Sequence, residues 1–285
     1  MSAVATPMTL ADVWDTILAP KFTRFREVLV RGAEPHGNRA LETWTPPPNA
    51  RAIDVGCGFG ESTFDLARYA GPSAIVTGVD IARSFIEIAR ADARARGSTH
   101  VGFVVADMED YAPREPVDYV FSRFGTMFFE RPVAAFRKVH AAMKPGAELV
   151  MTTWRPLNEN PWLAVAKAVA REWLPAPGPD AISCGPGPFS LSDPNVVRDV
   201  LSRAGFHSVT LVPSEGSTLI GRTLEAAIEF QLAIGPAGEI VREAGEAATA
   251  VLPELRRGMA RALESSVRDD GVFMPSSAWI VRALA

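Results

Sequence analysis

The chain has 285 residues, carries a formal net charge of −4, and is 47% hydrophobic and 22% charged. This length and ordinary composition predict a globular protein with either one large α/β domain bearing an insertion or two small domains. No long basic run indicates a nucleic-acid partner, the two cysteines lack metal-ligand spacing, and no apolar stretch is long enough to span a membrane.

Residues 1–48 are expected to form helices outside the central sheet. Met1–Leu10 lacks the basic and apolar regions of a signal peptide, so we expect a cytoplasmic protein. Thr9 is positioned to cap a first helix, Pro20 is expected to interrupt that helix, and a second helix is expected to end at Gly32. Such helices either cover a ligand site as a lid or belong to the core, and the sequence leaves both possibilities open.

After the stiff run of residues 46–48, short apolar segments alternate regularly with helical patterns. This alternation predicts a parallel sheet with helices on both faces. The strands are expected at residues 51–56, 74–79, 101–105, 117–121 and 147–153, followed by 207–212 and 278–281, the last antiparallel at the sheet edge.

Three glycines at alternate positions follow the first expected strand. Gly56, Gly58 and Gly60 separate Asp54 from a helix expected at residues 62–69. Glycine permits positive φ angles there and lets a ligand touch the backbone, and the start of the helix presents free N–H groups. We therefore expect a small-molecule site at the carboxyl end of this strand.

The spacing of these glycines argues against a dinucleotide. Glu61 occupies the position at which the fingerprint G-x-G-x-x-G has its third glycine. The carboxylates of Asp54 and Glu61 would repel a pyrophosphate, whereas both suit a cationic ligand. A further acid, Asp80, ends the second strand, where its carboxylate can accept hydrogen bonds from both hydroxyls of a ribose.

This ordered series resembles the class I, Rossmann-like S-adenosylmethionine-dependent methyltransferases, particularly the branch of the ubiquinone and menaquinone biosynthesis enzymes. The resemblance covers roughly residues 50–155 and includes the turn Lys144-Pro145-Gly146 before an apolar strand. It implies an α/β fold with a seven-stranded Rossmann-like sheet and S-adenosylmethionine as the cofactor.

The resemblance also implies which residues bind the cofactor. It assigns Asp54 and the glycine loop to the methionine end, Asp80 to the ribose, and Asp107 with Met108 to the adenine, above Ile81. The full predicted set for the cofactor is Asp54, Gly56, Cys57, Gly58, Gly60, Asp80, Ile81, Asp107, Met108, Ser122 and Arg123.

The second half contains two long segments that a minimal sheet does not need. Residues 175–188 are dense in proline and glycine, and further helices are expected at 224–232, 240–251 and 255–267. We predict that residues 1–48 form part of a helical cap on a core of residues 49–285, with cap insertions at about 155–192 and 215–275. The predicted substrate pocket consists of Phe124, Met127, Trp154, Trp162 and Phe189, whereas Phe128 and Phe129 are expected in the core.

Methyl transfer from a sulfonium is an in-line displacement that depends on alignment and exclusion of water, and a base is needed only if the acceptor must lose a proton. Of the four histidines, His36 is the candidate for that base, although a loop histidine in water is the simpler interpretation. No cluster of His, Asp and Glu has the spacing of a metal site.

These observations favour a metal-independent methyltransferase acting on a small, partly apolar molecule. An NAD(P)-dependent oxidoreductase shares the strand, the glycine loop and the ribose acid, and a non-catalytic S-adenosylmethionine-binding module shares the cofactor site; both stay open as alternatives. Protein and nucleic-acid substrates are disfavoured because their enzymes need an open, charged groove. The sequence leaves the oligomeric state and the choice among O-, N- and C-methylation open.

Overall fold

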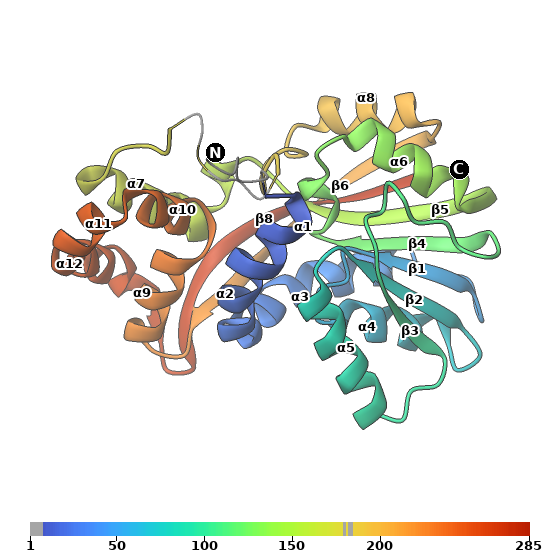
Figure 1. The fold of residues 1–285 in the computed structure, drawn as a ribbon, viewed down its shortest axis with the longest axis horizontal. Helices are drawn as coiled ribbons and strands as arrows, with labels where there is room; N and C mark the ends of the chain where they lie inside the picture. Colours follow the sequence, from blue (N-terminus) through green and yellow to red (C-terminus); the bar gives the residue numbers. More distant parts are fainter. Residues whose placement is uncertain (1–7, 179–180, 182–184) are drawn as a thin grey trace, which may run out of the picture.

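A computed structural model describes residues 8–178, 181 and 185–285. One mixed sheet runs through the described part of the chain (Figure 1). Along its main path the strands are β3 (Val101–Val105), β2 (Ile75–Asp80), β1 (Arg51–Val55), β4 (Val117–Arg123), β5 (Met143–Trp154), β8 (Gly271–Leu284) and β6 (His207–Gly221). Strands β3 to β5 are parallel, β8 runs antiparallel to both of its neighbours, and the two-residue strand β7 (Val267–Arg268) pairs with β8.

Helices cover both faces of the parallel half of the sheet because alternate strand residues point to opposite sides. Ala52 of β1 belongs to the core that includes helices α3 (Arg26–Thr43), α4 (Glu61–Ala70) and α5 (Arg83–Ala95). Its neighbour Ile53 belongs to the core on the other face, with α6 (Pro132–Ala141) and α8 (Pro194–Ala204). The α/β class with helices on both faces is therefore confirmed.

A second group of helices packs together beside the long strands β6 and β8. This group contains α7 (Pro161–Trp173), α9 (Leu224–Ala233), α10 (Gly235–Ala244), α11 (Glu246–Ala250) and α12 (Leu252–Leu263). Figure 1 shows these helices together at one end of the molecule, opposite β1, β2 and β3. We call them the distal helices; their role as a cap stays a prediction.

The N-terminal helices differ from the predicted ones in where they end. Thr9 caps α1 (Leu10–Val13), as predicted, and the chain continues through the π-helix η1 (Trp14–Leu18) into α2 (Ala19–Arg24). The predicted break at Pro20 is wrong, because Pro20 lies in the first turn of α2, where the missing N–H costs little.

The predicted helix end at Gly32 is also wrong, because α3 runs on to Thr43. A Cβ at Gly32 would lie 2.7 Å from Thr218 Cγ2 on β6, so this glycine allows close packing of helix on strand.

Three further expectations need correction. The helix predicted at 240–251 is two helices, because Gly245 adopts a φ of 53° between α10 and α11. The helix predicted at 255–267 gives way after Leu263 to a short 3₁₀ turn and β7. The strand predicted at 278–281 is longer and lies between β5 and β6, so the edge strand is β6.

Candidate functional site

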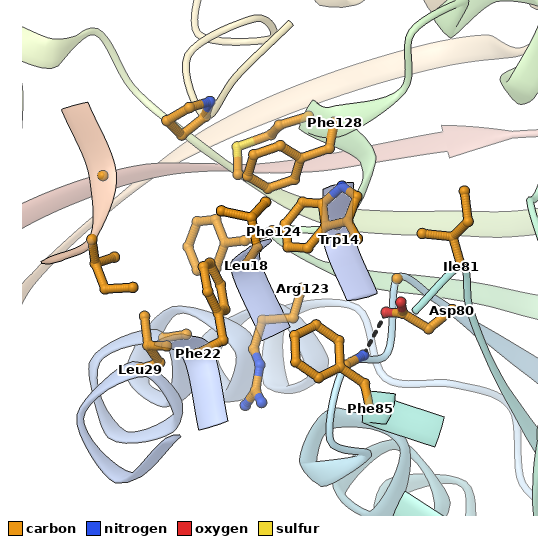
Figure 2. A pocket seen from close by; sticks show the side chains of 18 of the residues that line it. Trp14, Leu18, Phe22, Leu29, Asp80, Ile81, Phe85, Arg123, Phe124 and Phe128 are labelled. Atoms are coloured by element: carbon orange, nitrogen blue, oxygen red, sulfur yellow. Dashed lines mark hydrogen bonds between the residues drawn. The ribbon is translucent and has the colours of Figure 1, made fainter. Parts of the chain in front are cut away.

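A cavity of about 310 Å³ lies between the carboxyl ends of the parallel strands and the helices that cover them. Its wall comes from the glycine loop, the ends of β2, β3 and β4, the N-terminal helices, and α7, α9 and α10. Figure 2 shows part of this wall, where aromatic side chains and Asp80 surround the opening. The volume is in the range of small-molecule sites.

The glycine loop has the backbone that the sequence predicts. Gly56, Gly58 and Gly60 have φ angles of 66°, 54° and 91°, a region that other residues adopt at a cost. Gly56, Cys57 and Gly58 line the cavity, whereas Gly60 caps α4 behind the loop. A Cβ at Gly60 would lie 2.8 Å from the ring of Phe103, so the helix can approach β3 only with glycine there.

Asp80 holds this loop in place from the end of β2. Its carboxylate accepts a hydrogen bond from the backbone N–H of Gly58 at 2.8 Å, drawn as a dashed line in Figure 2, and another from the N–H of Ala82 at 2.9 Å. Burial nevertheless raises the pKa of Asp80 to about 6, because removal from water disfavours the charged form more than these bonds favour it. Asp80 lines the cavity, so its carboxylate faces both the loop and any bound ligand.

Two residues predicted to touch the cofactor lie behind the loop instead. Asp54 is fully buried, and its Oδ2 accepts hydrogen bonds from the hydroxyls of Ser62 and Thr63, each at 2.7 Å. Burial raises the pKa of Asp54 to about 6. Ser122 is also fully buried and donates to the carbonyl oxygen of Val55 at 2.8 Å. Neither side chain lines the cavity, so both support the loop from below.

Four further predicted cofactor residues beyond the glycine loop and Asp80 line the cavity. Ile81 follows Asp80, Asp107 and Met108 follow β3, and Arg123 ends β4. Asp107 Oδ1 accepts from the N–H of Glu109 at 2.9 Å, which orders the turn after β3. This side of the cavity carries five carboxylates, and we call it the acidic end: Glu61, Asp80, Asp107, Glu109 and Glu130.

Side chains from the segment after β4, from β5 and from α7 form a largely aromatic part of the wall. Of the residues predicted for the substrate pocket, Phe124, Met127, Trp154 and Trp162 line the cavity, whereas Phe189 does not; their contact with a substrate stays a prediction. The rings of Phe124 and Trp154 stack with centroids 3.8 Å apart and planes 13° apart. Phe124 has a φ of 60°, an unusual value for a bulky residue that is often found at functional sites.

Phe128 was expected in the core, but it also lines the cavity. Its ring makes an edge contact with Trp14 of the π-helix at a centroid distance of 5.0 Å. Trp14 in turn meets Phe22 and Phe85, and Figure 2 shows these four rings around the opening. The apolar stripe of the N-terminal helices is visible in the sequence, but nothing in it says that the stripe faces this cavity. Phe129 lines the cavity as well.

The N-terminal helices are fixed over the cavity by polar contacts. Asp15 of the π-helix accepts hydrogen bonds from the N–H and the hydroxyl of Ser84 at 3.0 and 2.8 Å, and thereby caps α5 from another segment. Arg26, at the start of α3, pairs with Glu61 and with Asp92. These contacts connect the covering helices to the elements that carry the glycine loop.

His36 lies inside α3 and not in a solvent-exposed loop, because the helix continues past Gly32. It is 1% exposed, its Nδ1 is 2.8 Å from Ser214 Oγ, and its Nε2 is 2.9 Å from Ser276 Oγ. Burial, with a smaller contribution from Arg39, lowers its pKa to about 4. The ring packs edge-on against Phe124 and Trp154 and does not line the cavity. We therefore no longer favour His36 as a base.

The buried imidazole makes stability depend on pH. The imidazole of His36 binds a proton near pH 6.5 in the unfolded chain, but only near pH 4 in the folded chain. The free energy of unfolding therefore decreases as the pH falls from 6.5 to 4. We expect the gap in unfolding free energy between the natural protein and His36→Gln to narrow by about 2 kcal/mol from pH 7.5 to pH 5. Urea unfolding at both pH values measures it, and a constant gap would contradict the buried neutral ring.

Within residues 8–178, 181 and 185–285, no group of three or more His, Cys, Asp and Glu side chains is arranged to hold a metal ion. In the same residues, no helix combines the length and the apolar character needed to cross a bilayer.

Comparison with known proteins identifies related sequences. Residues 47–180 match the family described as "Methyltransferase domain". Nocamycin O-methyltransferase of Saccharothrix syringae is 30% identical over 185 residues, which cover 61% of this chain and 65% of that protein. Ubiquinone biosynthesis O-methyltransferase of Xanthomonas campestris is 31% identical over 129 residues, which cover 45% of this chain and 51% of that protein. The chain thus spans about half to two thirds of the length of these curated relatives.

A solved structure shares the fold over nearly the whole chain. Phosphoethanolamine N-methyltransferase 2 of Haemonchus contortus, solved with phosphomonomethylethanolamine and S-adenosylhomocysteine, superposes with a TM-score of 0.60 at 16% identity. The match covers 98% of this chain and 60% of that one. At this identity the likeness concerns the fold alone, and it confirms the predicted Rossmann-like class.

Proposed function

We propose that this chain, whose residues 47–180 match the family described as "Methyltransferase domain", transfers the methyl group of S-adenosylmethionine to a small molecule. The observation that carries the proposal is the glycine loop held by Asp80, at the acidic end of the cavity and within the matched residues. The proposed transfer is in-line and independent of metal.

The residues of the acidic end fit the cofactor. The donor carries a positive sulfonium, and the carboxylates of the acidic end favour a cation there, although Glu61 and Glu109 are also paired with Arg26 and Arg131. Asp80 would accept hydrogen bonds from the ribose hydroxyls, and Asp107 and Met108 would contact the adenine. The glycine loop would contact the methionine portion of the cofactor. Arg123, which also lines the cavity, would face the methionine carboxylate.

Methyl transfer from a sulfonium requires little from the protein beyond the positioning of the two reactants. Bound S-adenosylmethionine supplies an electrophilic methyl group on a good leaving group. The stacked rings of Phe124 and Trp154 and the covering ring of Trp14 exclude water and align an acceptor. None of the four histidines lines the cavity. We therefore propose that no histidine acts as the base: an acceptor that must lose a proton either loses it before the transfer or gives it to another group.

A nicotinamide-dependent oxidoreductase is disfavoured by Glu61. Its carboxylate lines the cavity in the first turn of α4, where a pyrophosphate would need an anion-binding helix start. Calorimetry with S-adenosylhomocysteine and with NAD⁺ separates the two proposals. Binding of NAD⁺ alone would overturn ours.

Turnover separates an enzyme from a binding module. The purified chain is incubated with S-adenosylmethionine carrying a labelled methyl group and with a panel of small aromatic and aliphatic acids, phenols and amines. Transfer of label to any member supports the proposal. Cofactor binding with no transfer across the panel would favour a non-catalytic module.

The raised pKa of Asp80 predicts how cofactor affinity depends on pH. Donation by ribose hydroxyls favours the ionised carboxylate, which releases its proton near pH 6 in the free protein. We expect the affinity for S-adenosylhomocysteine to be constant above pH 7 and to fall up to about tenfold per pH unit below pH 6. Calorimetry from pH 5 to 8 measures it, and Asp54→Asn serves as a control that keeps the slope because Asp54 does not line the cavity. A flat profile down to pH 5 would exclude Asp80 from ligand contact.

A further inference from the structure

The two ends of the cavity differ in their charged side chains. Five of the six carboxylates that line the cavity lie at the acidic end, around the glycine loop and the ends of β2, β3 and β4. Two of these five are paired, Glu61 with Arg26 and Glu109 with Arg131, and Arg123 lines the same end. The side formed by α2 and α10 carries Lys21 and Arg242, with Glu239 as its one carboxylate. We call this side the basic end. Lys21 lies within electrostatic range of Arg242 and Glu239, and Figure 1 shows α10 among the distal helices, at the end of the molecule opposite β1, β2 and β3.

The wall between the two ends is apolar and largely aromatic. Phe22, Phe124, Trp154, Trp162 and Phe230 line it. Flat rings in such a wall favour a planar apolar ligand, because they remove its faces from water and stack on it. A small, fully hydrated acceptor would leave this surface without a partner.

The basic end is partly desolvated. Lys21 is half-buried, and burial followed by repulsion from Arg242 lowers its pKa, although Glu239 opposes the shift. A lysine in this position gains from an anion that enters the cavity. Arg242 pairs with Glu243, so part of its charge is already compensated.

Two other features of the cavity wall suit an acceptor atom of a ligand: the start of α10 and the hydroxyl of Thr218, which packs against Gly32 of α3. The α10 helix starts at Gly235 with no side-chain cap, and residues 234–236 line the cavity. The positive end of this helix dipole adds to the charge of Lys21. Thr218 also lines the cavity, and its buried hydroxyl oxygen has no hydrogen-bond partner among the described residues. A buried hydroxyl without a partner costs free energy that a ligand atom can recover.

We propose that the methyl acceptor is a planar, mainly aromatic molecule with one anionic group, which is held at Lys21 while the opposite end faces the methyl donor. This inference rests on the proposed function for the identity of the reaction. The preference for an anionic ligand, by contrast, is argued from the charged side chains of the cavity alone. It excludes amine acceptors that carry their positive charge toward α10, because an ammonium group there would face Lys21 and Arg242.

Three probes of equal size and different charge test the preference. The probes are 2-naphthoate, the neutral 2-naphthamide and the cationic 2-naphthylmethylamine, titrated by calorimetry into the full chain saturated with S-adenosylhomocysteine. We expect naphthoate to bind about tenfold more tightly than naphthamide and the amine to bind most weakly, as for a half-buried ion pair. Equal affinities, or tightest binding of the amine, would overturn the proposal.

Variants assign the preference to Lys21. Lys21→Met keeps the apolar stem, so naphthoate is expected to lose about tenfold in affinity while naphthamide changes less than about twofold. Lys167→Met removes an exposed lysine of α7 and is the matched control, expected to bind all three probes like the natural protein. Loss of naphthamide binding in Lys21→Met, or an unchanged naphthoate affinity, would count against the assignment.

The test separates this proposal from the proposed function. Calorimetry with S-adenosylhomocysteine on the same preparation reports whether the cofactor binds and whether each variant is folded. If it does not bind the natural protein, the proposed function fails, and titration of the three probes into the free chain still decides the charge preference.

Discussion

Asp80→Ala is expected to lower the affinity for S-adenosylhomocysteine more than a hundredfold. The carboxylate accepts hydrogen bonds from the N–H groups of Gly58 and Ala82, and it lines the cavity where we propose that the ribose binds. Hydrogen bonds to a charged group contribute about 1.5–3 kcal/mol each, so loss of the ligand contacts and of the loop support together exceeds about 3 kcal/mol. The free protein should remain folded, because the removed carboxylate is costly to bury.

The measurement is calorimetry at pH 7.5, where Asp80 is ionised in the natural protein. Asp199→Asn is the matched control, since Asp199 is an exposed acid of α8 whose ion pair is with Arg203, one turn away. It should bind the ligand normally. An Asp80→Ala variant that binds within about threefold of the natural protein would remove the main support for the cofactor site.

Gly125→Ala is expected to destabilise the fold by about 2–3 kcal/mol and to weaken cofactor binding at least about tenfold. A Cβ at this position would lie 2.7 Å from the carbonyl oxygen of Val55 and 2.8 Å from Gly56 Cα, both of them backbone atoms. Backbone on both sides leaves no flexible side chain to move away. The segment after β4 must therefore shift, and the glycine loop and the Phe124 ring shift with it.

Gly102→Ala provides the control for this variant. Gly102 lies in β3, and a Cβ there would meet no atom within 4 Å. Its stability should change by less than about 0.5 kcal/mol, as for other surface substitutions. Urea unfolding of both variants measures their stability, and calorimetry with S-adenosylhomocysteine measures their cofactor affinity. A Gly125→Ala protein of natural stability would show that the glycine loop and the segment after β4 need not touch.

The requirement for glycine at position 125 could not be predicted from local sequence patterns. Gly56, Gly58 and Gly60 were predicted from local rules, because the φ angle of a residue depends on its immediate neighbours. Gly125 has an ordinary φ and gives no local signal. Its small size is required by Val55 and Gly56, which reach it only through the pairing of β1 with β4.

His36 illustrates the same limit for a helix. The predicted end at Gly32 put this residue into a loop, where a histidine is expected to meet water. The helix continues because the packing of α3 against β6, for which Gly32 is small enough, outweighs its low intrinsic propensity. The partners of the imidazole, Ser214 and Ser276, lie 178 and 240 residues away along the chain.

The sequence by itself determined the α/β class, the order of strands and helices in the first half, the glycine loop and the carboxylate of Asp80. These features depend on periodicity, on backbone angles and on the fact that parallel strands end at the same edge of a sheet. The tertiary structure alone decided which faces meet: Trp14 and Phe128 over the opening, Lys21 in the cavity wall near Arg242 and Glu239, and Asp54 behind the loop. An apolar stripe identifies the buried face of a helix, but the surface that covers it comes from packing between segments distant in the chain.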